Sequence, residues 1–167
     1  MPKILTAVRH AKSSWDEPAL ADRERPLNNR GRRAAPGVAS YLLRLEHLPE
    51  GMLSSPARRA YETALLMAGV LNFPEANIRR DERLYFEGVD GIAAAIRETP
   101  DEINRLYFFS HEPVISEFCD RFCRLGKLHY PTTAVCAMQF EVDRWAEMEE
   151  RGRKLFFVIP KIIDPSL

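Results

Sequence analysis

The sequence is poor in cysteine, carries no excess of either charge and has no long hydrophobic run. Only three cysteines occur among its 167 residues, Cys119, Cys123 and Cys136. Their number is odd and their spacing contains no CxxC pair of the kind that zinc sites use. Cys119 and Cys123 lie one helical turn apart among phenylalanines, which is typical of a buried helix face. We therefore expect free buried thiols rather than metal ligands.

The charge balance and the hydropathy argue against further classes of protein. Lysine plus arginine and aspartate plus glutamate both total 24, so the net charge is zero. This balance does not favour a nucleic-acid-binding protein, which usually has a broad basic face. The apolar stretch near the N-terminus is too short for a signal peptide or a membrane span. We expect a cytoplasmic monomer that binds neither nucleic acid nor membranes, in which any anion site is a local cluster.

Segments typical of strands and helices alternate along the chain. This order predicts an α/β fold with a largely parallel sheet, and the length suits one domain spanning residues 1–167. We expect strands near 3–8, 52–54, 78–84, 106–109, 133–142 and 155–159, the last two antiparallel neighbours. We expect helices at about 29–46, 56–71 and 91–98, and another that Pro113 opens. Asn28 or Asn29, Ser55 and Asp90 are the expected N-caps of the first three.

Basic and imidazole side chains follow three of these expected strands. Arg9 and His10 come after the first, Arg58 and Arg59 follow Ser55 after the second, and His111 follows the strand at 106–109. In an open α/β sheet, ligands bind outside the carboxyl ends of the strands. Cations and the N–H groups of a helix N-terminus suit a phosphoryl group, and a neutral imidazole among them can attack phosphorus.

Five sequence blocks occur in order along the chain. They are VRHAKSSW at 8–15, RPLN at 25–28 with Gly31, LSSPARRA at 53–60 with Thr63 and Ala64, His111 with Pro113, and PTTA at 131–134. This series resembles the histidine phosphatase superfamily, which has the phosphoglycerate mutase-like fold. Within it, the chain resembles the small bacterial SixA-type phosphohistidine phosphatases. The resemblance implies three α/β/α layers around a mostly parallel sheet with an antiparallel edge.

The resemblance also implies a two-step phosphoryl transfer. His10 would take the phosphoryl group and water would remove it, while Arg9, Arg59 and His111 hold its oxygens. No metal or organic cofactor is needed. The partner would be a phosphorylated protein histidine or a small phosphate ester.

Further residues are candidates for phosphate or substrate contacts. They are Ser13, Arg25 and Thr132, together with Lys12 and Thr133 at the rim, although turn or capping roles would explain the hydroxyls equally well. Arg25 would reach the phosphate or form a surface ion pair with Asp22 or Glu24. The sequence leaves these alternatives open.

The general acid departs from the family pattern. Related small phosphatases often have Leu-Tyr-Glu near the middle of the chain, whereas this sequence has Leu84-Tyr85-Phe86-Glu87. Either Glu87 serves as the acid after a small backbone shift, or no dedicated acid exists. Imidazole leaves far more readily than an alkoxide, so a missing acid favours phosphohistidine substrates. The alternatives are a small-molecule phosphomonoesterase or mutase with Glu87 as acid, and a phosphate-binding module with little turnover.

Other charged residues have simpler interpretations. Successive helical residues point about 100° apart, so Arg58 is expected in solvent when Arg59 faces the site. Glu62 would orient the Arg59 guanidinium or face solvent. His47 and His129 are expected at the surface or in loops.

Overall fold

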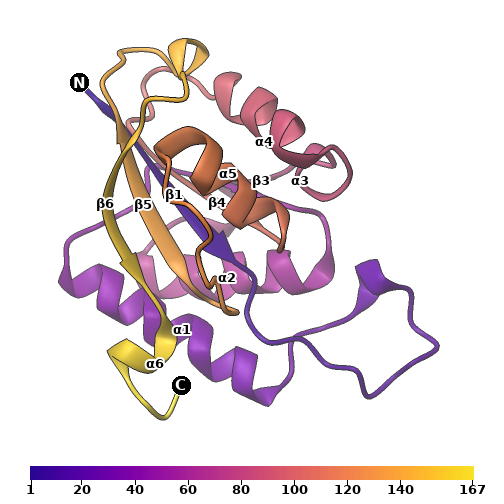
Figure 1. Ribbon diagram of the computed structural model, residues 1–167. Coiled ribbons are helices and arrows are strands. Elements are labelled where there is room, and N and C mark those ends of the chain that lie inside the picture. Colours follow the sequence, from indigo (N-terminus) through magenta and orange to yellow (C-terminus); the bar gives the residue numbers. More distant parts are fainter.

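The computed structural model describes residues 1–167 and contains a six-stranded sheet between two layers of helices (Figure 1). The strand order is β3-β2-β4-β1-β5-β6. The first four strands along the chain run parallel, and β5 is antiparallel to both β1 and β6. The strands are β1 Lys3–Arg9, β2 Gly51–Ser54, β3 Ile78–Arg80, β4 Arg105–Ser110, β5 Val135–Phe140 and β6 Arg153–Val158. The expected α/β fold and antiparallel edge are confirmed.

Helices cover both faces of the sheet. They are α1 Asn29–Arg44, α2 Arg58–Leu71, α3 Arg83–Phe86, α4 Gly88–Arg97, α5 Val114–Cys123 and α6 Pro160–Ile163, with 3-10 turns η1 Asp22–Glu24, η2 Glu75–Asn77 and η3 Trp145–Glu147. Helices α1 and α2 pack on one face, and α4 and α5 pack on the other (Figure 1).

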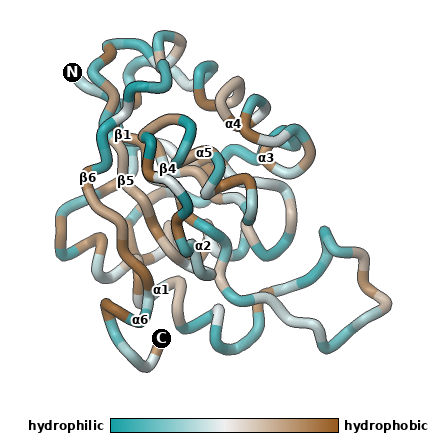
Figure 2. Tube along the Cα trace, viewed as in Figure 1, coloured by the Kyte–Doolittle hydropathy of each residue, from teal (hydrophilic) through white to brown (hydrophobic).

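Each face of the sheet has its own hydrophobic core. Successive side chains of a strand point to opposite faces, so Phe108 joins the core under α4 and α5, while Phe109 joins the core under α1 and α2. Figure 2 shows hydrophobic residues along the central strands and mostly hydrophilic residues along the long loop after β1. The sheet is therefore packed on both faces, and the loops that follow its strands are attached to this packed sheet.

The start of α1 holds the loop after β1 in place. The Asn28 side chain accepts a hydrogen bond from the Gly31 backbone N–H at 2.9 Å, which confirms the expected N-cap. A Cβ on Gly31 would lie 2.2 Å from the backbone oxygen of Lys12. Only glycine lets the helix approach the loop this closely.

Two expected helix starts are wrong. Helix α2 begins at Arg58 rather than at Pro56, with Ala57 at its N-cap position. The Ser55 hydroxyl still accepts a hydrogen bond from the Ala57 backbone N–H at 3.2 Å, and it also lies 2.8 Å from His111 Nε2. Helix α4 begins at Gly88, and Asp90 lies in its first turn. The Asp90 carboxylate pairs with Arg121 at 2.7 Å instead of capping.

The expected strand at 78–84 is also shorter than its sequence indicates. Strand β3 ends at Arg80, and Arg83–Phe86 forms the short helix α3. Asp81 causes this change, since its Oδ1 accepts a hydrogen bond from the Arg83 backbone N–H at 3.0 Å. Such a local side-chain bond turns the chain away from the sheet.

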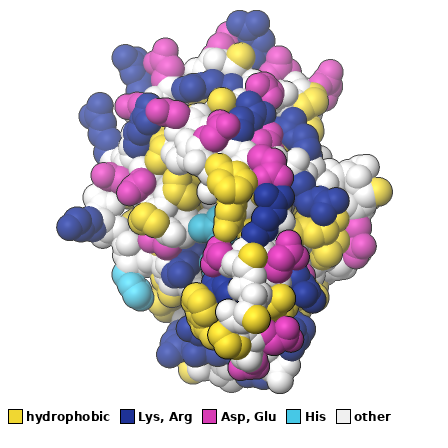
Figure 3. Space-filling model, turned by 90° about the vertical axis from the view of Figure 1, so that its right-hand side faces the viewer, with side chains coloured by type: hydrophobic (Ala, Val, Ile, Leu, Met, Phe, Trp, Pro, Cys, Tyr) yellow, Lys and Arg dark blue, Asp and Glu magenta, His cyan; other side chains and the backbone are white.

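The cysteines are free, as expected, with Cys119 and Cys136 buried and Cys123 half-buried. The chain contains no cluster of three or more histidine, cysteine or carboxylate side chains that could hold a metal ion. None of the helices combines the length and the hydropathy needed to span a bilayer. Side chains of both charge signs are interspersed over the face that Figure 3 displays, with no broad area of one sign.

Candidate active site

A polar cavity of about 240 Å³ lies where the segments after β1 and β4 meet the start of α2. Every candidate site residue that the sequence indicated contributes to its wall, with the exceptions of Glu87 and Thr133. The lining residues are Arg9, His10, Lys12, Ser13, Trp15, Arg25, Arg59, His111, Glu112 and Thr132. The chain therefore brings together side chains that are up to about 120 residues apart in sequence.

His10 is buried and held in one orientation. Its backbone N–H donates to the Ser110 carbonyl at 3.1 Å, and its ring Nδ1 lies 2.7 Å from the Ala11 carbonyl. A carbonyl only accepts, so Nδ1 carries the proton and Nε2 has a free lone pair. Burial, together with the positive charges of Arg59 and Arg9, lowers the pKa of His10 to about 3. At neutral pH the ring is therefore an uncharged base with one unprotonated nitrogen.

His111 faces His10 across the cavity, with 5.2 Å between the ring centroids. Its Nε2 lies 2.8 Å from the Ser55 hydroxyl oxygen, and its Nδ1 is buried without a hydrogen-bond partner. In the tautomer in which Ser55 donates to Nε2, Nδ1 carries the proton and is free to donate to an anion. Burial and the nearby Arg59 lower the pKa of His111 to about 3 as well.

Arg59 projects from the first turn of α2 and is only 6% exposed. Its Nη1 donates to the backbone oxygen of Asp22 at 2.8 Å, and its Nη2 donates to the Asp22 carboxylate at 3.0 Å. These two bonds fix the plane of the guanidinium and leave Nε without a partner. The neighbouring Arg58 is half-exposed and pairs with Glu62 at 2.6 Å, which confirms its expected surface position.

Arg25 forms the ion pair with Asp22 that the sequence suggested, and it also lies on the cavity wall. Its Nε donates to Asp22 Oδ1 at 3.3 Å, and its guanidinium also lies on the cavity wall with Nη1 buried and unpartnered. The guanidinium stacks on the exposed Trp15 ring, 3.5 Å from the ring centroid. Trp15 therefore holds Arg25 from the solvent side.

Unpartnered donors concentrate in this cavity. Six buried side-chain polar atoms of the chain lack a hydrogen-bond partner, and four belong to cavity residues: Arg9 Nε, Arg25 Nη1, Arg59 Nε and His111 Nδ1. Native proteins rarely leave such groups unsatisfied, because each costs about 1–3 kcal/mol. All four belong to side chains that donate hydrogen bonds and surround an unprotonated imidazole nitrogen. The cavity is therefore built for a multiply charged oxyanion.

The carboxylates near the cavity are already engaged or lie outside it. Glu87 is exposed between α3 and α4 and does not line the cavity. Glu112 does line it, but its two oxygens accept hydrogen bonds from the Ser116 backbone N–H and hydroxyl, each at 2.8 Å. The structure thus places no free carboxylate on the cavity wall.

Asp22 and Tyr85 belong to the site although the sequence gave neither a site role. The Tyr85 hydroxyl donates to Asp22 Oδ2 at 2.6 Å, and its ring packs edge-on against His111 with centroids 5.4 Å apart. This hydrogen bond and the neighbouring Arg59 lower the pKa of Asp22 to about 2. The spacing of Asp22 three residues before Arg25 was the only signal of its position.

Glu62 does not orient Arg59, because it bonds Arg58 and the Leu27 backbone N–H. His47 lies in the loop between α1 and β2, as expected. It is half-buried there, and its Nε2 lies 2.7 Å from the Thr6 hydroxyl oxygen.

Comparison with known proteins agrees with this geometry. Residues 5–85 match the family model of the histidine phosphatase superfamily, branch 1. The chain belongs to the histidine phosphatase superfamily. An uncharacterized protein of Mycobacterium leprae, ML1117, is 30% identical over 92% of this chain and all of its own length. An uncharacterized chloroplastic protein of Arabidopsis thaliana is 38% identical over 67% of this chain, and the match spans only half of that protein.

Solved structures show the same fold at lower identity. The protein histidine phosphatase SixA, complexed with tungstate, aligns with a TM-score of 0.81 at 21% identity, covering 96% of this chain and 99% of that one. A mycobacterial glucosyl-3-phosphoglycerate phosphatase aligns with a TM-score of 0.64 at 15% identity, covering 91% of this chain and 96% of that one. The three-layer architecture of this histidine phosphatase is therefore shared with enzymes that act on different phosphates.

Proposed function

We propose that this histidine phosphatase removes phosphoryl groups from histidine side chains of proteins, through a covalent phosphohistidine on His10. One observation carries the proposal: a neutral, oriented His10 with Nε2 unprotonated lies among buried N–H donors that have no partner in the chain. A nucleophile needs its lone pair free at the pH of the reaction, and the lowered pKa of His10 provides this.

The first step transfers the phosphoryl group. The Nε2 lone pair of His10 forms a bond to phosphorus as the substrate P–N bond breaks, and that electron pair stays on the departing imidazole. In the second step a water oxygen attacks phosphorus, the P–Nε2 bond breaks, and phosphate and a proton leave. We assign Arg9, Arg25, Arg59 and His111 to the phosphoryl oxygens, because their donors act where the transition state spreads its negative charge.

The leaving group favours phosphohistidine over alkyl phosphates. A phosphorylated imidazole that is protonated on its second nitrogen leaves as a neutral ring, whose conjugate acid has a pKa of about 6.5. An alkoxide needs a proton from a nearby acid. Glu87 lies outside the cavity and Glu112 is held by Ser116, so neither supplies one in this geometry. We propose that the substrate is a phosphorelay or phosphotransfer protein in the cytoplasm.

Hydrolysis of a phosphohistidine peptide by the His10→Ala variant tests the proposal. We expect loss of turnover at an unchanged melting temperature, and retained turnover would refute the role of His10. The rival phosphomonoesterase or mutase predicts appreciable hydrolysis of alkyl phosphates that collapses in Glu87→Gln. A binding module with little turnover predicts phosphate binding without any covalent label on His10.

A further inference from the structure

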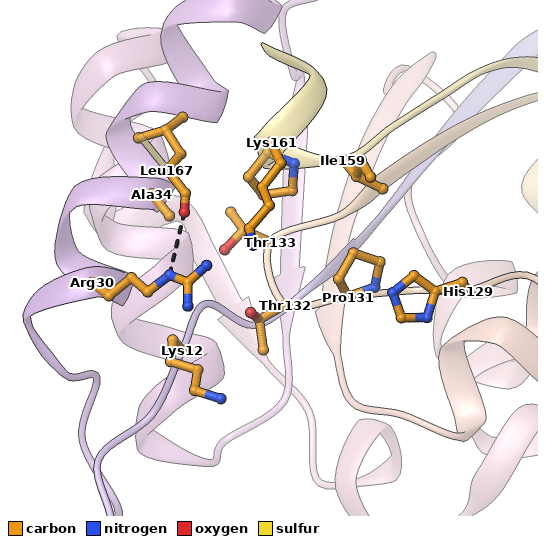
Figure 4. A pocket seen from close by; sticks show the side chains of 11 residues that line it. Lys12, Arg30, Ala34, His129, Pro131, Thr132, Thr133, Ile159, Lys161 and Leu167 are labelled. Carbon is orange, nitrogen blue, oxygen red and sulfur yellow. Dashed lines mark hydrogen bonds between the residues drawn. The ribbon is translucent and has the colours of Figure 1, made fainter. Parts of the chain in front are cut away.

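A second cavity, of about 230 Å³, lies beside the active site between α1, α6 and the loop before β5 (Figure 4). The charged side chains of its lining are all basic, and Leu167, the last residue of the chain, also lines it. Arg30 projects into it from α1, Lys161 from α6 and Lys12 from the loop after β1, and no aspartate or glutamate contributes to its wall. We call this cavity, with these three cations, the basic subsite.

The two lysines of the basic subsite are available to a ligand. No aspartate or glutamate side chain lies within ion-pair distance of Lys12, Arg30 or Lys161. The Arg30 Nε donates to an oxygen of the carboxyl group of Leu167, the last residue of the chain, at 3.3 Å (Figure 4). This contact orients the Arg30 side chain and leaves its two Nη groups free.

A buried hydroxyl adds a second, independent feature. Thr133 is 1% exposed, lines the basic subsite, and its Oγ1 has no hydrogen-bond partner in the chain. Its φ of 65° is unusual for a β-branched residue. A buried hydroxyl without a partner costs free energy that a hydrogen bond to a ligand would recover. Cations and a hydroxyl together suit a carboxylate.

The basic subsite adjoins the active site directly. Lys12 and Thr132 line both cavities. The Thr133 backbone N–H also lies 3.2 Å from the carbonyl oxygens of Arg9 and His10. A ligand group in the basic subsite is therefore close to the phosphoryl position, within the reach of a short peptide.

We infer that the basic subsite binds the carboxylate of an acidic residue a few positions from the phosphohistidine of the substrate protein. The inference rests on the proposed function. It adds a substrate preference, namely for phosphohistidine in an acidic sequence context.

Binding of paired peptides tests this preference without requiring turnover. Each peptide carries a phosphonate-bearing triazole that mimics phosphohistidine and cannot be hydrolysed, flanked by glutamates in one member of the pair and by glutamines in the other. Calorimetry measures both Kd values for the wild type, for Lys161→Gln and for Lys154→Gln. Lys154 is an exposed lysine of β6 outside both cavities, so its variant makes the same change of charge elsewhere.

We expect the wild type and Lys154→Gln to bind the glutamate peptide about two- to fivefold more tightly, the range that single exposed ion pairs give. In Lys161→Gln the preference should shrink toward one while the Kd of the glutamine peptide stays the same. Added salt should also reduce the preference of the wild type for the glutamate peptide. Equal affinity for both peptides in the wild type, or an equal preference in both variants, would overturn the inference.

Turnover of authentic phosphohistidine peptides is measured separately. If these peptides are not hydrolysed in a His10-dependent way, the proposed function is contradicted. The binding experiment then still decides whether the basic subsite binds carboxylates.

Discussion

Replacing Arg59 tests the architecture of the phosphate site most specifically, because its neighbour Arg58 provides a matched control. The two arginines are adjacent in α2, but Arg59 is buried on the cavity wall and Arg58 pairs with Glu62 at the surface. We expect Arg59→Ala to lower kcat/KM for a phosphohistidine peptide by about 10²–10³, equivalent to about 2.7–4 kcal/mol of transition-state stabilisation. Arg58→Ala should change it less than about threefold, since an exposed ion pair contributes only about 0–1 kcal/mol.

Arg59→Lys separates charge from geometry. The guanidinium makes two bonds to Asp22 and has a further N–H, at Nε, without a partner, whereas an ammonium cannot reproduce this planar set of donors. We therefore expect Lys to recover only part of the activity lost in the Ala variant. Steady-state kinetics on all three variants, with melting temperatures to exclude unfolding, make the comparison. Equal effects at Arg58 and Arg59, or full activity of Arg59→Lys, would refute the assignment.

Three further predictions follow from single contacts. Ser55→Ala removes the hydroxyl that His111 contacts, and we expect it to lower kcat/KM about tenfold. Near-UV circular dichroism verifies that the fold is unchanged. An undiminished rate would contradict a role of Ser55 in holding His111. Because the pKa of His10 is about 3 when folded and about 6.5 when unfolded, only the unfolded chain gains this proton as pH falls from about 6.5 toward 3. Between pH 7 and pH 4.5, the free energy of unfolding should therefore drop by about 2 kcal/mol more in the wild type than in His10→Asn. Urea denaturation at both pH values measures these two drops. Equal drops in the two proteins would contradict a buried neutral His10 ring. Gly31→Ala places a Cβ against the Lys12 backbone oxygen and should destabilise the protein by about 1–3 kcal/mol in the same assay, unlike Gly69→Ala, where the added Cβ meets no atom within 4 Å.

The sequence predicted the fold class and most of the cavity wall because both follow from the order of the segments along the chain and from the residues that end each strand. Buried strands followed directly by His10 and His111 fix where the imidazoles emerge, and the arrangement of parallel strands brings them to one edge. The helical offset between Arg58 and Arg59 implies that only one of them faces the cavity, and the resemblance to the family assigned Arg59, which is the buried one.

Other features depend on contacts between distant segments and could not be read in advance. Asp22 lies in the short 3-10 turn η1, in a part of the sequence without hydrophobic periodicity, and its partners Arg59 and Tyr85 come from other elements. Ser55 fits the usual pattern of an N-cap and bonds the Ala57 backbone N–H, but its contact with His111, which comes from a distant segment, could not be read from that pattern. Local propensity was outweighed by tertiary packing at these positions.

The covalent intermediate is the central claim, and rapid-quench trapping tests it most directly. A phosphohistidine protein with a radiolabelled phosphoryl group is mixed with excess enzyme, quenched in alkali, and digested to locate the label. The account predicts transient label on a peptide that contains His10, in amounts that approach one per active site, and none in His10→Ala. Hydrolysis of the substrate without label on His10 at any time point, or label on another residue, would contradict it.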